Sequence, residues 1–276
     1  MSVLYVVGTP IGNLSDMTPR AIEILNNVDF IAAEDTRVTL KLLNKFEIKK
    51  PLISYFEHNR TEKGQYIVDR IKNGEKCAIV TDAGMPCISD PGEDLVKLCR
   101  EQNVRVEVVP GPTAVMSALA VSGLSCSRFC FEGFLSTAKK SRFEHLESLK
   151  NETRTMVFYE APHKLKATLN DMKKYFGGER KISLCRELTK LHEEVVLTNL
   201  DDAINMYEQN EPRGEFVLVI DGAEIKNNMI DSLDEALLIM REMVNSGKSK
   251  TDAAKLMAKS SVFKKNDLYK LLVEEN

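Results

Sequence analysis

The chain has 276 residues, of which 43% are hydrophobic and 29% charged, so it can form one large or two medium globular domains. Its net charge of -3 does not by itself indicate nucleic acid, and no apolar run approaches the length of a membrane span, so we expect a cytoplasmic protein without signal peptide or membrane anchor. The six cysteines and four histidines show no metal-ligand spacing, which favours reduced thiols and no metal site.

The first predicted strand, residues 3–7, runs into a tight loop that contains Gly8, Pro10 and Gly12. This loop lacks the spacing G-x-G-x-x-G, so it does not support a dinucleotide fingerprint. A second strand is predicted at 28–33, before a helix at 39–46. Open α/β sheets bind ligands beyond the carboxyl ends of their strands, although a solvated loop with a local ion pair also fits the segment AEDTR. Three polar candidates for chemistry follow the second strand: Glu34, Asp35 and Arg37.

The chain is organised around residues 81–92, TDAGMPCISDPG, which follow a buried apolar run and precede a helical pattern. We expect Asp90 to cap that helix and Pro91 to begin it. A strand, a stiff loop and a helix N-terminus favour a negatively charged ligand group. One such loop is equally an ordinary turn, but the pattern recurs with a Pro-Gly-Pro turn at 106–123. We expect Gly84 and Gly111 to approach a ligand through backbone alone.

The order of elements changes in the second half of the chain. Strands are predicted around Leu184, Val196 and Val217 without long crossover helices, which indicates antiparallel pairs. We therefore predict an α/β protein with a mostly parallel N-terminal sheet in residues 1–115 and a mixed second sheet in residues 116–225. Further polar candidates follow predicted strands: Asp82, Glu160 and His163.

Residues 226–276 have no strand signal and are predicted to form three short helices that lack a strong core of their own. Between Val244 and Val273 there are seven lysines and two aspartates, a local charge of +5. A basic helical extension on an acidic body is a candidate RNA contact, although a solvated lysine-rich helix face is common. The candidate RNA-binding residues are Lys248, Lys255, Lys259 and Lys264.

Several motifs occur together and in order: VGTPIGNL, AEDTR, TDAGMPCISDPG, VPGPTA, YEAPHKL, RELTKLHEE and RGEFVLVI. Over residues 1 to about 222 the chain resembles the tetrapyrrole methylase superfamily, and in particular the bacterial small-subunit ribosomal RNA methyltransferase I family. Members of that family methylate the ribose 2′-oxygen of a decoding-region cytidine in 16S rRNA. The resemblance implies two α/β domains with a basic helical extension, a homodimer, and 16S rRNA or the assembled small ribosomal subunit as substrate.

The resemblance also implies S-adenosylmethionine as cofactor, bound in the cleft between the two domains. Relatives that act on tetrapyrroles usually carry Gly-Asp-Pro where this chain has Gly84-Met85-Pro86, which counts against a tetrapyrrole substrate. The implied cofactor contacts are Pro10, Gly84, Met85, Ile88, Thr113, Ala114, Tyr159, Leu188, Gly214, Glu215 and Phe216.

Methyl transfer to a ribose hydroxyl gains from in-line positioning and from a general base within hydrogen-bond reach. The sequence does not decide which of the five candidate carboxylates and imidazoles is the base. Arg37 is instead a candidate for orienting phosphate. Two other functions stay open: a small-molecule methyltransferase, which would not need the basic tail, and a non-catalytic RNA-binding assembly factor, which would not need the cofactor. The candidate bases are Glu34, Asp35, Asp82, Glu160 and His163.

Overall fold

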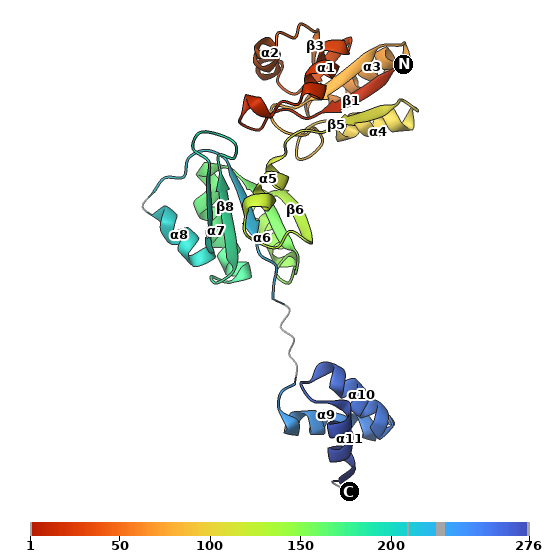
Figure 1. Cartoon of the computed structure of the whole chain (residues 1–276), viewed down its shortest axis with the longest axis vertical. Coiled ribbons are helices and arrows are strands. Elements are labelled where there is room, and N and C mark those ends of the chain that lie inside the picture. The colour runs from red at the N-terminus through yellow and green to blue at the C-terminus, as the bar shows by residue number, and fades with distance from the viewer. Residues whose placement is uncertain (1, 209, 225–229, 275–276) are drawn as a thin grey trace. The chain divides into compact units, whose positions relative to one another are not determined.

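The structure is a computed structural model of the chain that describes residues 2–208, 210–224 and 230–274. These residues form two compact units, Met1–Ala223 and Glu224–Asn276. The first unit contains two five-stranded sheets with helices on both sides, and the second contains three helices (Figure 1). In the described part of the chain, no helix has the length and apolar character needed to cross a membrane.

The first sheet is parallel throughout, with the strand order β3-β2-β4-β1-β5. Its three inner strands are short apolar runs that are largely buried on both faces, as expected for a parallel sheet covered by helices, whereas the two edge strands are partly exposed. They are β1 (Val3–Val7), β2 (Phe30–Ala33), β3 (Leu52–Ser54), β4 (Lys76–Val80) and β5 (Val106–Val109).

Two apolar layers hold the helices of this half against the first sheet. On one face, Ile67 of α3 and Leu95 of α4 pack with Leu4 and Ile79. On the other face, α1 and α2 bury side chains such as Leu25. The parallel arrangement brings the carboxyl ends of all five strands to one edge, where the connecting loops lie. The helices are α1 (Pro19–Asn27), α2 (Thr36–Lys45), α3 (Arg60–Lys72) and α4 (Glu93–Glu101).

The second sheet has the order β6-β7-β10-β8-β9, and only the β6–β7 pair is parallel. The predicted mixed sheet is thereby confirmed. Helices α6, α7 and α8 pack on one face, and α5 packs on the other through Ala118 and Leu119. The elements are α5 (Ala114–Val121), β6 (Phe129–Phe134), α6 (Lys139–Ser148), β7 (Thr155–Glu160), α7 (Pro162–Phe176), β8 (Lys181–Arg186), β9 (Glu194–Asn199), α8 (Leu200–Glu208) and β10 (Phe216–Ile220).

The second unit consists of α9 (Leu233–Asn245), α10 (Lys250–Ser260) and α11 (Lys265–Glu274). Ser232 and Ser249 cap the first two helices by accepting hydrogen bonds from Glu235 N and Asp252 N. The expectation that these helices lack a core is wrong, because all three contribute apolar side chains to one buried cluster. That cluster comprises Ala236, Leu237, Met240, Ala253, Ala254, Met257, Leu268 and Leu272.

Candidate active site

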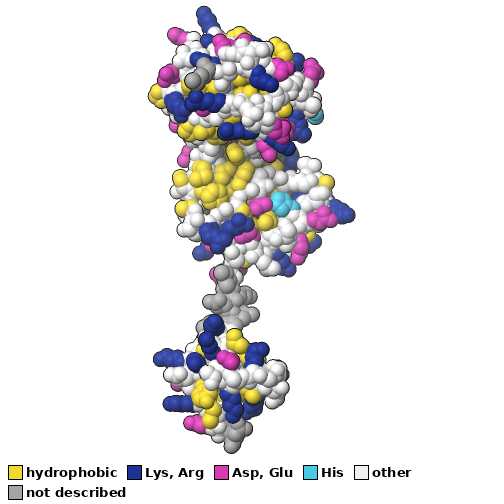
Figure 2. All heavy atoms as spheres, turned by 90° about the vertical axis from the view of Figure 1, so that its right-hand side faces the viewer, with side chains coloured by type: hydrophobic (Ala, Val, Ile, Leu, Met, Phe, Trp, Pro, Cys, Tyr) yellow, Lys and Arg dark blue, Asp and Glu magenta, His cyan; other side chains and the backbone are white. Residues whose placement is uncertain are grey.

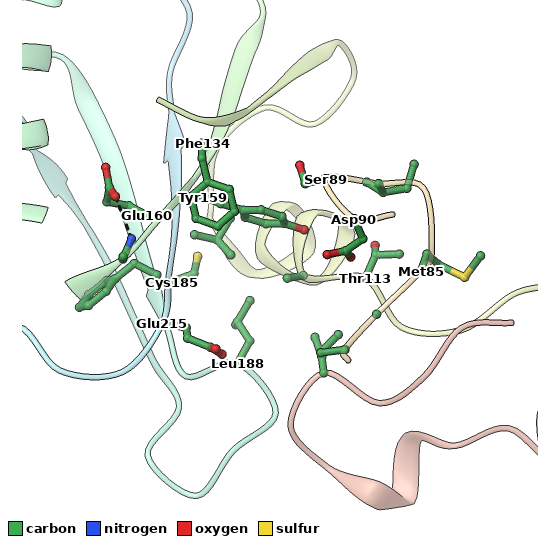
Figure 3. A pocket seen from close by; sticks show the side chains of 18 of the residues that line it. Met85, Ser89, Asp90, Thr113, Phe134, Tyr159, Glu160, Cys185, Leu188 and Glu215 are labelled. Carbon is green, nitrogen blue, oxygen red and sulfur yellow. Dashed lines mark hydrogen bonds between the residues drawn. The ribbon is translucent and has the colours of Figure 1, made fainter. Parts of the chain in front are cut away.

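A cavity of about 490 Å³ lies between the loops at the carboxyl edge of the first sheet and the second sheet. Figure 3 shows Met85, Asp90 and Thr113 on one side of it, and Tyr159 and Glu160 on the other. This volume lies within the usual range for small-molecule sites. The described lining residues include most of the predicted cofactor contacts: Gly84, Met85, Ile88, Thr113, Ala114, Tyr159, Leu188, Glu215 and Phe216.

Two predicted cofactor residues, Pro10 and Gly214, are not among the described lining residues, although their neighbours Ile11 and Glu215 are. Gly214 has a φ of +84°, and a Cβ there would lie 2.5 Å from Cγ of Glu187. The glycine therefore lets the chain pass close to Glu187, whose Oε1 accepts a hydrogen bond from Glu215 N at 2.9 Å. This close approach and hydrogen bond fix the position of Glu215, which does line the cavity.

The two glycine-rich loops of the first sheet are tied together by backbone hydrogen bonds. Thr9 N donates to Gly84 O at 2.9 Å, and Gly84 N donates to Thr9 O at 3.1 Å. Gly111 is not among the described lining residues of this cavity, and it packs against the loop that contains Gly8. A Cβ on Gly111 would lie 2.9 Å from Cα of Gly8. Gly84 therefore borders the cavity, whereas Gly111 permits the close packing of the loops behind it.

Left-handed backbone at non-glycine residues is concentrated beside the cavity. Of the six such residues in the described part of the chain, two lie in the loop after β4, Cys87 (φ 74°) and Ser89 (φ 62°), and two lie on either side of Leu188, Glu187 (φ 51°) and Thr189 (φ 66°). The other two are Glu47 and Asn103. This conformation is unfavourable for residues with a Cβ and persists where the surrounding structure enforces it. Both loops are thus held in fixed conformations against the cavity.

Sequence reasoning missed Asp90, which lines the cavity and was assigned to helix capping. That assignment is wrong: α4 begins at Glu93, and Gly92 is its N-cap without any side-chain hydrogen bond. Gly92 adopts a φ of +135° and a Cβ there would lie 2.9 Å from Cys87 Sγ, so the loop turns back on itself before the helix. The Asp90 carboxyl is therefore available to the cavity (Figure 3).

Four of the candidate catalytic residues form a network beyond the carboxyl ends of β2 and β4. The Asp35 carboxylate caps α2 by accepting from Arg37 N at 2.8 Å and binds the Arg37 guanidinium at 2.6 Å. Asp82 Oδ1 accepts from Asp35 N at 3.2 Å, and Glu34 Oε2 accepts from Asp82 N at 3.3 Å. The structure brings these four together, but they are not among the described residues that line the cavity.

The environments of these carboxylates differ. Hydrogen bonds from Arg37 lower the pKa of Asp35 to about 2. Burial raises the pKa of Glu34, with repulsion from Asp82 and Asp35 adding to it. Burial also raises the pKa of Asp82, and the charge of Asp35 adds to that rise. The network therefore holds one firmly ionised carboxylate and two whose ionised forms are disfavoured.

The other two catalytic candidates, Glu160 and His163, do line the cavity. Glu160 is buried, and its carboxylate accepts hydrogen bonds from Thr168 Oγ1 and from Ala161 N. These bonds tie the end of β7 to α7. His163 is an exposed residue in the first turn of α7.

The four candidate RNA-binding lysines are all exposed on the second unit. Lys248 precedes α10, Lys255 and Lys259 lie within α10, and Lys264 precedes α11. None of them has an ion-pair partner among the described residues. Figure 2 shows basic side chains distributed over the visible face of this unit.

Relatives of known name cover almost the whole chain. Residues 3–204 match the family described as Tetrapyrrole (Corrin/Porphyrin) Methylases. A Synechocystis protein named ribosomal RNA small subunit methyltransferase I is 46% identical over 274 residues, which cover 99% of this chain and 98% of that protein. A Thermotoga maritima protein of the same name is 49% identical over 224 residues, which cover 81% of this chain and 100% of that protein.

Two solved structures are similar in fold to this chain. A uroporphyrin-III-C-methyltransferase from Thermus thermophilus has a TM-score of 0.57 at 19% identity and covers 80% of this chain and 94% of its own. A diphthine synthase has a TM-score of 0.61 at 11% identity and covers 80% of this chain and 89% of its own. At these identities the similarity concerns the fold alone.

Proposed function

This chain belongs to the tetrapyrrole methylase family, and on that premise we propose that it methylates the ribose 2′-hydroxyl of a cytidine in the decoding region of 16S rRNA. Its methyl donor is S-adenosylmethionine, as in the family of which it is a member. The observation that carries the proposal is the cavity, whose lining includes nine of the eleven predicted cofactor residues, from both halves of the first unit.

The cavity fits this donor in size and in chemistry. Apolar side chains such as Ile11, Ile88 and Leu188 line it, and a few polar groups, including Thr113 and Glu215, converge on it. Gly84, at a φ of +87°, brings backbone to the wall without a side chain. When bound, the donor supplies a methyl group on a positively charged sulfur.

The protein's own contribution is to position the reacting groups and to exclude water. The ring of Tyr159 packs against Phe131 and Phe134, with centroid distances of 5.0 and 5.4 Å. These rings make one wall of the cavity rigid and apolar. Because the positive charge of a sulfonium disperses during methyl transfer, an apolar wall does not oppose that reaction.

The RNA substrate is supported by the lysines of α10 and α11 and by the names of the full-length relatives. Phosphate contacts from clustered lysines provide affinity and register on a folded RNA. Met85 stands where relatives acting on tetrapyrroles carry aspartate, which favours RNA over a tetrapyrrole. We propose the assembled small subunit, or 16S rRNA itself, as the substrate in the cytoplasm.

We also propose a homodimer, for which the first unit offers an apolar surface. Helix α5 buries Ala118 and Leu119 yet exposes Met116 and Val121. Leu197 on β9 is exposed close to the end of α5, since a Cβ on Gly123 would lie 3.2 Å from it. Figure 2 shows hydrophobic side chains gathered on one face of the first unit, and such patches mark association surfaces.

The test is mass mapping of 16S rRNA from cells with and without this gene, followed by methylation of the unmodified subunit with the purified protein. We expect one ribose-methylated cytidine to be lost and then restored in vitro. Saturating S-adenosylmethionine should raise the melting temperature, because a ligand of the folded state stabilises it. Unchanged RNA masses in the absence of the gene contradict the rRNA substrate, and an unchanged melting temperature contradicts the cofactor site.

A further inference from the structure

We propose that Asp90 is the catalytic base that takes the proton from the attacking hydroxyl group. The proposal rests on the proposed function, since it assumes a hydroxyl acceptor. Asp90 and Ser89 line the main cavity and also a second cavity of about 250 Å³. They are the residues common to both linings in the described part of the chain, so Asp90 stands where a ligand of one cavity meets a ligand of the other.

The second cavity is suited to a polar substrate group. Its lining includes Arg60, which forms an ion pair with Asp94 at 2.8 Å. Three further charged side chains line it: Glu57, Glu93 and Asp94. The apolar main cavity thus suits the methyl donor, and the polar second cavity suits the substrate.

Asp90 also differs from the other carboxylates around the site in being free to accept a proton. It makes no hydrogen bond or ion pair with any described residue, and Figure 3 shows its carboxyl directed into the cavity. By contrast, Asp35 is held by Arg37, Glu160 by Thr168, and Glu215 by Lys190 at 2.8 Å. A carboxylate already committed to protein donors is a poor base, because proton transfer to it must break those bonds.

The electrostatic environment favours the same residue. Burial raises the pKa of Asp90 to about 7, and the charges of Glu34 and Asp82 contribute to the rise. A base with a pKa near the working pH combines a useful ionised fraction with a useful affinity for the proton. The other titratable groups that line the main cavity are Tyr159, Glu160, His163, Cys185 and Glu215. Those that line the second cavity are Tyr55, Glu57, Arg60, Cys87, Glu93 and Asp94.

The proposed step balances without any further reactant. The 2′-oxygen forms a bond to the methyl carbon of the sulfonium donor, and the electron pair of the broken carbon–sulfur bond stays on the sulfur, which becomes a neutral thioether. The hydroxyl proton passes to Asp90 and is later released to solvent. The products are the ribose methyl ether, the thioether and a protonated Asp90 carboxyl.

The experiment compares the wild type with Asp90→Asn, which keeps the size of the side chain and removes its basicity. Asp69→Asn is the matched control, because it makes the same change at an exposed residue of α3 that lines neither cavity. We expect Asp90→Asn to lower kcat by about 100-fold or more, while Asp69→Asn stays within about threefold. S-adenosylmethionine affinity, measured by calorimetry, should change by less than about threefold in both variants.

Two pH measurements separate a base from a residue that merely shapes the cavity. The wild-type rate should rise with pH through an apparent pKa near 7, and Asp90→Asn should lose this rise. Because the folded pKa of Asp90 lies above its usual 3.8, the folded protein binds more protons between these values. The contribution of Asp90 to stability therefore falls as the pH rises from about 4 to about 7, so the melting temperature of Asp90→Asn should rise relative to that of the wild type over this range.

The proposal is overturned if Asp90→Asn retains more than about one tenth of the wild-type rate. It is also overturned if the variant loses donor affinity as steeply as it loses rate, since Asp90 would then be a donor ligand. Failure of the wild type to methylate 16S rRNA contradicts the proposed function instead. In that case the rates of the same variants are compared with the hydroxyl substrate that the wild type does methylate. The melting temperature is measured against pH without any substrate, so it tests Asp90 in either case.

Discussion

The two compact units place their functional residues in different ways. In the first unit the cavity is assembled from distant segments, for example Gly84 after β4, Tyr159 on β7 and Phe216 on β10. In the second unit the exposed lysines lie on or beside two consecutive helices, α10 and α11. The chemical site therefore depends on tertiary folding, whereas the basic surface is already present in the local sequence. The predictions below test whether the two units divide cofactor binding and RNA binding between them.

The largest effect is expected from filling the cofactor cavity at Gly84. Gly84→Val places a branched side chain at a cavity wall, so S-adenosylmethionine affinity should fall by about 100-fold, or ~2.7 kcal/mol. Gly74→Val is the matched control, because Gly74 also has a positive φ (+108°) but no atom within 4 Å of an added Cβ. Both variants carry the same kind of backbone strain. Equal affinity losses in calorimetry would show that strain, and not the cavity, is responsible.

Ending the chain after Ala223 should separate the two functions. The first unit keeps both sheets and all its buried clusters, so S-adenosylmethionine affinity should change by less than about twofold. RNA affinity should fall by something on the order of tenfold to a hundredfold when the phosphate contacts are lost. The Thermotoga maritima relative, matched over its whole length by 224 residues of this chain, is close in length to this truncated form.

Filter binding to the unmodified subunit and light scattering provide the measurements for the truncated protein. If the second unit only supports dimerisation, the truncated protein will change its oligomeric mass and keep its RNA affinity per folded dimer. That outcome would end the assignment of RNA binding to the second unit.

A smaller effect is expected from removing four charges without deleting any helix. Log RNA affinity falls linearly with log salt concentration, and each phosphate contact contributes roughly 0.7 to 0.9 to the steepness of that slope. Replacing Lys248, Lys255, Lys259 and Lys264 by Gln should therefore make the slope shallower by about three. The control replaces four exposed lysines of the first unit: Lys41, Lys45, Lys49 and Lys97. Titrations at several salt concentrations compare the two sets. The same slope in both would place the RNA contacts elsewhere.

The smallest effect is expected at the Asp35–Arg37 pair. The Arg37 side chain is 86% exposed at the edge of the first sheet, where it can meet a phosphate. Arg37→Ala should lower methylation by about fivefold while S-adenosylmethionine affinity and melting temperature stay nearly unchanged. Methylation assays with saturating cofactor provide the measurement. Wild-type turnover in Arg37→Ala would show that the Asp35–Arg37 pair serves only to cap α2.

Regular elements were predictable because their signals are local. The apolar run Val3–Val7 forms β1 within the predicted bounds, and the three C-terminal helices follow their own caps and apolar spacing. The mixed second sheet was also predictable, because the strands around Leu184 and Val196 are too close in sequence for crossover helices. Helix α2 starts at Thr36 rather than at residue 39, since the Asp35 carboxylate caps it.

The errors arose where contacts across the chain override local patterns. Asp90 and Pro91 look like a cap and a first helical residue, but the turn at Gly92 moves the start of α4 to Glu93. Each C-terminal helix has only a narrow apolar face, and their common core appears only when the three pack together.

The sequence by itself determined the α/β class, the glycine- and proline-rich loops after the strands, the family motifs and the basic C-terminal segment. Only the tertiary structure decided which carboxylates meet and which of them face the cavity. Glu34 and Asp82 are 48 residues apart in the chain and join through one hydrogen bond, and Asp90 receives its raised pKa from burial and from these two neighbours. Charge–charge repulsion depends on distances in space, and the pairing of β2 with β4 sets the distance between the loops that carry these carboxylates.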